Sequence, residues 1–184
     1  MILKETTARN PKIKELYLSS FPEEERKSIN FIETLRKEGK CTVLAAEEYG
    51  KFSGLAIMLT DSKYALIDYL AVDTESRGTG LGSKILDCLK EKYRDKCLFL
   101  ERETVTHTAD NAYDRARRRR FYLKNGFSDT GIFVNVYTVD MTLMTCDSSI
   151  TFEEYSAFLL KTVGRRIFDI IKVVKSNISD ENLQ

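Results

Sequence analysis

The sequence is poor in proline. Only two occur among its 184 residues, Pro11 and Pro22, and both lie near the start. No low-complexity stretch and no internal repeat follows them. Prolines and biased stretches mark linkers, so regular structure is expected almost throughout the chain. A length of 184 residues fits one domain, because domains commonly hold ~100–200 residues.

Residues that bind metals are also scarce. The only histidine is His107, and no two cysteines form a C-x-x-C pair. The spacings typical of zinc and redox sites are therefore missing, and we expect no metal. The four cysteines have mostly apolar neighbours, which predicts buried, reduced thiols. They are Cys41, Cys88, Cys97 and Cys146.

The sequence has almost no net charge and no long apolar run. Lys and Arg number 29 against 28 Asp and Glu, which gives a formal net charge of +1. A near-neutral balance argues against bulk electrostatic capture of nucleic acid or of an anionic membrane. The first residues, Met-Ile-Leu-Lys-Glu, show no apolar signal core. We therefore expect a cytoplasmic protein with no nucleic-acid partner and no membrane contact.

Apolar spacing predicts a mixed order of strands and helices. Strands are expected at 1–7, 42–47, 52–59, 65–72, 97–101, 131–136 and 137–144, and helices at 12–20, 23–38, 83–93 and 111–125. A helical tail at 152–160 and 165–174 follows, and 176–184 is expected to fray. This order predicts an α/β fold around a partly antiparallel sheet.

A glycine-rich segment lies between an apolar strand and an amphipathic helix. Residues 77–84 read Arg-Gly-Thr-Gly-Leu-Gly-Ser-Lys. Glycine permits positive φ, and the N–H groups at a helix start attract negative oxygens. Arg77 adds a planar cation suited to phosphate. The glycine spacing matches neither the Walker pattern nor the dinucleotide-binding pattern, so neither a nucleoside triphosphate nor a dinucleotide is predicted as the ligand.

Two motifs in this chain resemble those of the GNAT acetyltransferase superfamily. The first is Arg-Gly-x-Gly-Leu-Gly after Leu-Ala-Val-Asp, and the second is the segment 116–127, with Phe121-Tyr122 followed by Gly126-Phe127. They occur in the family's order, and the resemblance covers residues 1 to about 144. It implies a mostly antiparallel sheet splayed between its fourth and fifth strands. It also implies an N-acetyltransferase domain at 1–146 with a helical extension at 147–184.

The resemblance implies that acetyl-CoA is the co-substrate and that a primary amine attacks it directly. The backbone of the fourth strand would pair with pantetheine, and the glycine loop would hold the pyrophosphate. The strand residues are Leu70, Ala71 and Val72. The loop residues are Arg77, Gly78, Thr79, Gly80, Leu81, Gly82 and Ser83.

Two catalytic residues follow from the same resemblance. Tyr122 matches the tyrosine that relatives place near the CoA sulfur, where a phenol protonates the leaving thiolate. Glu101 matches a glutamate that some relatives use as the base, and Glu103 is the runner-up on the same strand face. The alternatives are a tyrosine packed against the sheet and a solvent-facing or salt-bridged glutamate.

The start of the helix expected at 111–125 is less clear. Asn111 either caps this helix or contacts the pantetheine amide. Many relatives have an asparagine seven residues before the tyrosine, but this chain has Arg115 there. Together with the arginines at 117–120, Arg115 forms a basic patch. Such a patch is a solvated helix surface, a contact for the 3′-phosphate of CoA, or a nucleic-acid contact. His107 is expected in a surface loop, and the alternative is a role in binding substrate or in shuttling a proton.

The acceptor cannot be read from the sequence. A small-molecule amine and a peptide amine both remain open, as does a homodimer. The acidic run at 23–25 either attracts a cationic amine or starts a helix. Two other functions compete with the enzyme: a non-catalytic CoA-binding sensor or interaction module, and a basic nucleic-acid module.

Overall fold

The structure is a computed structural model that describes residues 1–136, 138–146, 148–171, 173–176 and 180. The chain divides into two compact units, Met1–Lys96 and Cys97–Gln184. Each unit contains strands and helices, and each is described by itself.

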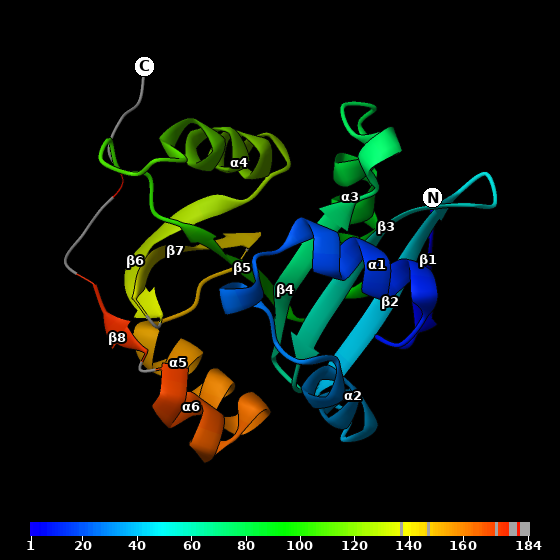
Figure 1. The fold of residues 1–184 in the computed structure, drawn as a ribbon. Coiled ribbons are helices and arrows are strands. Elements are labelled where there is room, and N and C mark those ends of the chain that lie inside the picture. Colours follow the sequence, from blue (N-terminus) through cyan, green and yellow to red (C-terminus); the bar gives the residue numbers. More distant parts are fainter. Residues whose placement is uncertain (137, 147, 172, 177–179, 181–184) are drawn as a thin grey trace. The chain divides into compact units, whose positions relative to one another are not determined.

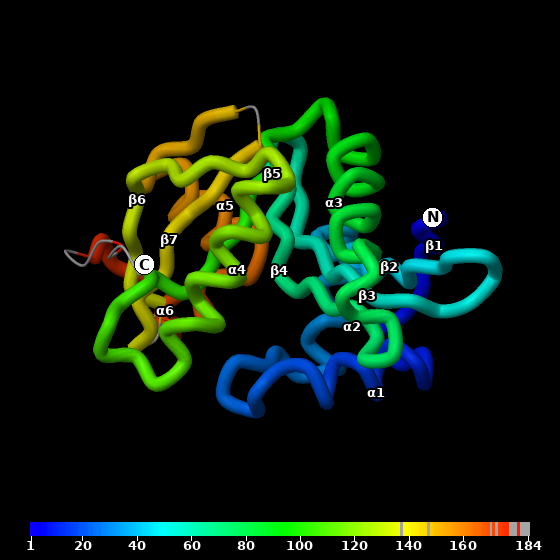
Figure 2. The backbone as a smooth tube through the Cα atoms, turned by 90° about the horizontal axis from the view of Figure 1, so that it is seen from above, coloured from blue at the N-terminus to red at the C-terminus, as the bar shows by residue number. Residues whose placement is uncertain are grey.

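The first unit is built on four antiparallel strands in chain order. They are β1 (Ile2–Thr6), β2 (Cys41–Glu48), β3 (Lys51–Thr60) and β4 (Tyr64–Val72). The helices are α1 (Pro11–Ser20), α2 (Ile29–Lys37) and α3 (Leu81–Lys92), with 3₁₀ turns η1 (Glu23–Glu25) and η2 (Thr74–Ser76). Within this unit α3 lies on one face of the strands, and α1 and α2 lie on the other (Figure 2).

Local turn chemistry sets the hairpins of the first unit. Tyr49 and Gly50, between β2 and β3, both have positive φ (51° and 77°). Paired positive φ values suit the twist of a two-residue hairpin turn. Between β3 and β4, the Asp61 carboxylate accepts hydrogen bonds from the backbone N–H groups of Lys63 and Tyr64, each at 2.8 Å. The three strands predicted here are confirmed.

The helix predicted at 23–38 is wrong in its first part. Residues 23–25 form only η1, and α2 begins at Ile29. The Ser28 hydroxyl accepts a hydrogen bond from the Phe31 N–H at 3.2 Å, which caps a new helix start. Gly39 follows the end of α2 with a φ of 72°, as its predicted stop requires.

Strand β4 contains a bulge that the sequence pattern does not reveal. Ile57 pairs with Tyr69, but the next residue, Met58, pairs with Ile67, so Asp68 is an extra residue. A bulge interrupts the regular alternation of side chains. Asp68 contacts Lys27, and Tyr69 packs edge-on against Tyr17 of α1, with ring centroids 4.9 Å apart. Two consecutive β4 side chains thus make contacts with the segment that contains α1 and the approach to α2.

The second unit has a four-stranded antiparallel arrangement in the order β5-β7-β6-β8. The strands are β5 (Cys97–Glu103), β6 (Ser128–Val136), β7 (Val139–Cys146) and β8 (Val174–Lys175), and the helices are α4 (Ala112–Lys124), α5 (Phe152–Val163) and α6 (Arg165–Ile171). In Figure 1, α4 lies on one side of these strands, and α5 and α6 lie on the other. Phe99 of β5 packs edge-on against Phe158 of α5, at 5.4 Å.

The predicted end of the chain needs correction. The helix expected at 165–174 stops at Ile171, and Val174 and Lys175 pair with β6 as a strand. The prediction of fraying is wrong for Ser176, whose N–H donates to the Phe133 carbonyl at 2.8 Å. It is also wrong for Asp180, which Arg102 binds. Residues 177–179 and 181–184, and Tyr137 of the strand expected at 137–144, lie outside the described residues.

The α/β class and the mostly antiparallel pairing are confirmed. The division at residues 146 and 147 stays a prediction, as does the splay between the fourth and fifth strands. Across the residues that the structure describes, every helix is too short or too polar to span a bilayer.

We predict that Gly54→Ala destabilises the first unit. A Cβ added to Gly54 would lie 2.5 Å from the Ala71 carbonyl oxygen and 3.0 Å from Ile85 Cδ1. Overpacking of this kind costs roughly 1–3 kcal/mol of unfolding free energy, which urea denaturation measures. Gly131→Ala is the control, because its Cβ meets open space and only its φ of 74° opposes the change. An unchanged urea midpoint for Gly54→Ala would contradict the clash.

Candidate functional site

The glycine loop joins β4 to α3. After η2, Gly78 has a φ of 77°, and Gly80 caps α3 with a φ of 84°. Residues that carry a side chain rarely adopt these φ values, so the turn requires glycine at both positions. Gly78, Thr79 and Gly80 are exposed. The backbone of the loop therefore faces solvent.

The loop offers a row of backbone donors. Within the described part of the chain, the N–H groups of residues 78–82 have no hydrogen bond, and the first bonded amides are those of Ser83 and Lys84, both to the Gly80 carbonyl. The first N–H groups of a helix have no acceptor inside it. Together with the helix dipole they attract an anion. This donor set fits a diphosphate.

Arg77 supplies the positive charge beside these donors. Its Nε donates to the Val72 carbonyl at 3.3 Å, and its side chain is exposed. The Thr79 hydroxyl donates to the Ser76 carbonyl at 2.6 Å and shapes the turn. Lys84 pairs instead with Glu48. The residues predicted to contact the pyrophosphate thus lie in one loop and helix start. Among them, the Ser83 N–H already donates to the Gly80 carbonyl.

The two acidic residues of β5 have different partners. Glu101 is half-buried, and the Tyr155 hydroxyl of α5 donates to it at 2.8 Å. Glu103 forms ion pairs with Arg118 and, at 2.9 Å, with Arg115, both from α4. Ion pairs occupy both oxygens of Glu103. Glu101 is therefore the better candidate for a group that accepts a proton.

Tyr122 lies in the last part of α4. Its ring packs edge-on against Phe121 at 5.2 Å and against Phe127 at 6.0 Å. Burial raises the pKa of the Tyr122 phenol, and the nearby charge of Arg118 opposes this only in part. The phenol therefore keeps its proton at neutral pH, which a general acid needs. The packed tyrosine of the alternative interpretation is also present, and the two are compatible.

Asn111 stands at the N-cap position of α4, but its side chain does not cap the helix. Its Nδ2 donates to Glu103 at 3.2 Å, and its Oδ1 accepts from Arg115 Nε at 2.6 Å. Arg115 also donates to the Thr104 carbonyl at 2.9 Å. The arginine that departs from the family pattern is thus held in place by three groups. His107 is exposed in the loop before α4, as predicted.

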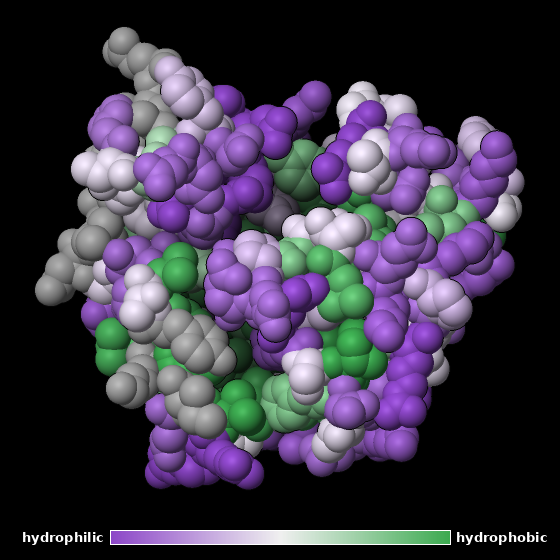
Figure 3. All heavy atoms as spheres, in the orientation of Figure 1, coloured by the Kyte–Doolittle hydropathy of each residue, from purple (hydrophilic) through white to green (hydrophobic). Residues whose placement is uncertain are grey.

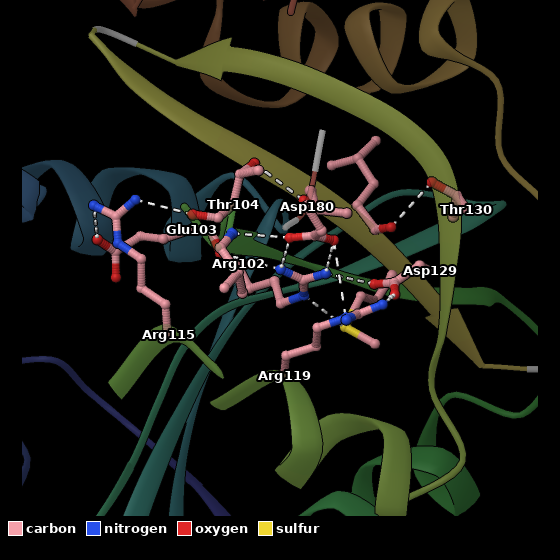
Figure 4. A network of polar contacts seen from close by, with 12 residues as sticks. Arg102, Glu103, Thr104, Arg115, Arg119, Asp129, Thr130 and Asp180 are labelled. Carbon is pink, nitrogen blue, oxygen red and sulfur yellow. Dashed lines mark hydrogen bonds and ion pairs between the residues drawn. The ribbon is translucent and has the colours of Figure 1, made fainter. Parts of the chain in front are cut away.

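A buried ionic network was missed by the sequence analysis (Figure 4). The Arg102 side chain is only 1% exposed, and its guanidinium binds Asp129 at 2.6 Å and Asp180 at 2.9 Å. Asp180 also accepts from the Val105 N–H at 2.8 Å. Arg119 of α4 binds Asp129 at 2.8 Å. The charged run Glu101-Arg102-Glu103 in an otherwise apolar strand was the one available sequence signal.

Four of the five arginines in the patch on α4 form ion pairs. Arg115 and Arg118 bind Glu103, Arg117 binds Asp114, and Arg119 binds Asp129. Arg120 is exposed and has no ion pair to any described residue. Figure 3 shows hydrophilic side chains over α4. These contacts favour the solvated-surface interpretation over a phosphate or nucleic-acid contact.

Comparison with known proteins decides the family. Residues 39–129 match the family model described as the acetyltransferase (GNAT) domain. The chain belongs to the GNAT acetyltransferase superfamily. This match includes both the glycine loop of the first unit and Tyr122 of the second.

A curated relative named as an acetyltransferase supports this assignment. The chain is 37% identical over 107 residues to a protein named as acetyltransferase YjbC from Bacillus subtilis (strain 168). The match spans 58% of this chain and only 52% of that relative, about half of its length.

Solved GNAT structures share the fold. A protein described as a GNAT-family acetyltransferase from Bacteroides thetaiotaomicron matches 89% of this chain and 98% of its own, with a TM-score of 0.69 and 19% identity. A GNAT family acetyltransferase from Elizabethkingia anophelis, solved with acetyl-CoA bound, matches 80% of this chain and 97% of its own, with a TM-score of 0.60 and 18% identity.

Among the described residues, no cluster of three or more metal-ligating side chains occurs.

Proposed function

We propose that this protein transfers an acetyl group from acetyl-CoA to a primary amine by direct attack. The observation that carries the proposal is the row of unbonded N–H groups at 78–82 beside Arg77. A diphosphate supplies the negative oxygens that these donors lack. The relative solved with acetyl-CoA supports the choice of ligand.

Two parts of acetyl-CoA, the diphosphate and the pantetheine arm, have proposed contacts. The diphosphate lies on the loop amides of Gly78, Thr79, Gly80, Leu81 and Gly82, with Arg77 and Ser83 beside it. The pantetheine arm pairs with the backbone of Leu70, Ala71 and Val72 as an added strand would. Asn111 contacts a pantetheine amide only if its bonds to Glu103 and Arg115 rearrange.

The reaction needs two proton transfers. An acceptor amine arrives as an ammonium, with a pKa near that of lysine, ~10.4. Glu101, directly or through a water, takes the proton, and the amine nitrogen then attacks the thioester carbonyl carbon. When the tetrahedral intermediate collapses, the C–S bond breaks and Tyr122 gives its proton to the CoA thiolate. The products are an acetamide and CoA.

We predict that Gly80→Val weakens acetyl-CoA binding at least ~tenfold. Forcing a side chain into a left-handed conformation costs roughly 1–2 kcal/mol per residue, and relief of this strain moves the amides that bind phosphate. Isothermal titration calorimetry with acetyl-CoA measures the loss. Gly39→Val is a matched control, because Gly39 has a φ of 72°, its Cβ also meets open space, and it lies at the end of α2.

Calorimetry on the unmodified protein tests the function itself. A binding isotherm with acetyl-CoA and thiol release over a panel of amines support an N-acetyltransferase. Indifference to acetyl-CoA would overturn the proposal. Binding without turnover on any amine would favour the second candidate, a CoA-binding sensor or interaction module.

The setting of the reaction belongs to the same proposal. We infer an acceptor that is a small-molecule or peptide amine, and a cytoplasmic location, which suits four cysteines that remain thiols. The segment 152–174 either covers the acceptor or forms a homodimer, and the mass of the protein in solution tests the homodimer.

A further inference from the structure

One buried carboxylate in the first unit lacks a hydrogen-bond donor for one of its two oxygens. The Asp68 side chain is 9% exposed. Its Oδ1 accepts from Lys27 Nζ at 2.7 Å, whereas its buried Oδ2 has no hydrogen-bond partner among the described residues. A buried carboxylate oxygen without a donor is costly, and it therefore requires an explanation.

The β4 bulge explains how Asp68 reaches this position. As the extra residue of the bulge, Asp68 has no cross-strand partner on β3. Bulges commonly re-aim side chains at binding sites. Asp68 and the neighbouring Tyr69 both contact Lys27, which lies between η1 and α2. The bulge therefore directs a carboxylate toward an aromatic cluster.

The aromatic cluster consists of Tyr17, Phe21 and Tyr69. Tyr69 is packed edge-on against Tyr17 and Phe21, with each pair of centroids 4.9 Å apart. The Lys27 ammonium lies 5.2 Å from the centre of the Tyr69 ring. An aromatic face with an adjacent carboxylate is a favourable environment for an alkylammonium. Lys27 shows that such a group fits here.

The backbone of Lys27 is anchored independently of its side chain. The Lys27 N–H donates to the Tyr69 hydroxyl at 3.0 Å, and the Lys27 carbonyl accepts from the Tyr17 hydroxyl at 3.0 Å. Residues 26–28 are neither helix nor strand. The four-carbon stem of a lysine is flexible. Its ammonium can therefore move without disturbing the backbone.

The surroundings favour a cation. The Tyr69 hydroxyl donates to the Glu25 carbonyl at 2.8 Å, which ties the exposed acidic run Glu23–Glu25 to the cluster. Burial, followed by the charge of Asp68, raises the pKa of the Cys41 thiol to about 12. Cys41 therefore stays neutral. The carboxylates outnumber Lys27 and Arg26 in this region.

We propose that the Lys27 ammonium occupies the acceptor-ammonium site, and that a cationic amine displaces it to bind Asp68. This inference rests on the proposed N-acetyltransferase function and names the acceptor class, a small polycationic amine. The incoming ammonium has three donors, enough to bond both Asp68 oxygens, and the acidic run binds a second cationic group.

Spermidine is the probe, and opposite effects of two variants are the test. In Lys27→Met the site loses its internal occupant, so the affinity for spermidine should rise about tenfold, the typical contribution of one charge-assisted hydrogen bond. In Asp68→Asn the charge is lost at nearly constant shape, and the affinity should fall about tenfold or more. Calorimetric titration of the full chain at low salt measures both.

Two controls separate this effect from general electrostatics. Lys63→Met removes a lysine that lies over the Tyr64 ring at 4.9 Å, and Asp87→Asn removes an exposed carboxylate paired with Lys90. Neither should change spermidine binding by more than about twofold, since screened surface charges contribute little. Thermal melts confirm that each variant is folded.

The outcomes distinguish the inference from the function. Equal spermidine affinity in all the variants, or no saturable binding in any, would overturn the displaced-lysine site. Acetyl-CoA binding is measured on the same samples and should not change. If acetyl-CoA binds but spermidine affinity is indifferent to both substitutions, only this inference fails. If acetyl-CoA does not bind the unmodified protein, the proposed function fails instead.

Discussion

Tyr122→Phe should lower kcat about a hundredfold and leave acetyl-CoA affinity unchanged. The substitution removes only the hydroxyl, because a phenylalanine ring keeps the contacts with Phe121 and Phe127. Loss of a general acid typically costs 10²–10⁴-fold in rate. Thiol release at saturating acetyl-CoA measures kcat, and calorimetry measures the affinity. Since burial holds the pKa of Tyr122 above its ordinary value, the acid form should persist beyond pH ~10.

Tyr113→Phe is the matched control for this prediction. Tyr113 lies on the same helix but is 80% exposed, so loss of its hydroxyl should leave kcat unchanged. A fully active Tyr122→Phe variant would show that water or another group protonates the leaving thiolate. The packing interpretation of Tyr122 would then be sufficient.

Arg102→Met should lower the free energy of unfolding by roughly 3–5 kcal/mol. Removing one member of a buried ion pair costs this much because the remaining charge stays buried without its partner. Here Asp180 would lose its bonds to the Arg102 guanidinium, and Asp129 would lose one of its two arginine partners and keep Arg119. Urea denaturation measures the loss. Arg94→Met, at an exposed pair with Glu91, should change stability by less than about 1 kcal/mol.

The network also predicts an acid-sensitive component of stability. Burial raises the pKa of Asp180, but hydrogen bonds from Arg102 and from the Val105 N–H outweigh it, so the net pKa is lowered. A carboxylate with a lowered folded pKa stabilises the fold at pH values above its unfolded pKa, ~3.9, and this contribution disappears as the pH falls through the folded pKa. The loss of unfolding free energy as the pH falls should therefore be less steep in Arg102→Met than in the unmodified protein. An identical pH dependence of the unfolding free energy in the two proteins would exclude the network as the source of the acid sensitivity.

The features that the sequence predicts depend on neighbouring residues. The glycine loop follows from residue types within eight positions, and the hairpins follow from turn residues and alternating apolar positions. Gly78 and Gly80 adopt positive φ as expected, and the strands fall near their predicted ranges. Because such patterns are local, they can be read without knowing the rest of the fold.

The features that escape prediction depend on distant partners. Arg102 binds Asp129, 27 residues away, and Asp180, 78 residues away. The Asp68 bulge is a property of the register between β3 and β4, and strand β8 exists only because β6 offers an edge. The break before α2 did have a local cause in Ser28, but an unbroken apolar spacing masked it.

The arginines of α4 show that a count of charges does not fix an electric field. Four of the five form ion pairs with three carboxylates of the chain itself, Arg115 and Arg118 sharing Glu103. Arginines that are already paired with carboxylates neutralise fewer charges of a polyanion and so release fewer of its condensed counterions, and this release drives the association. A heparin column should therefore retain this protein only weakly, despite four consecutive arginines.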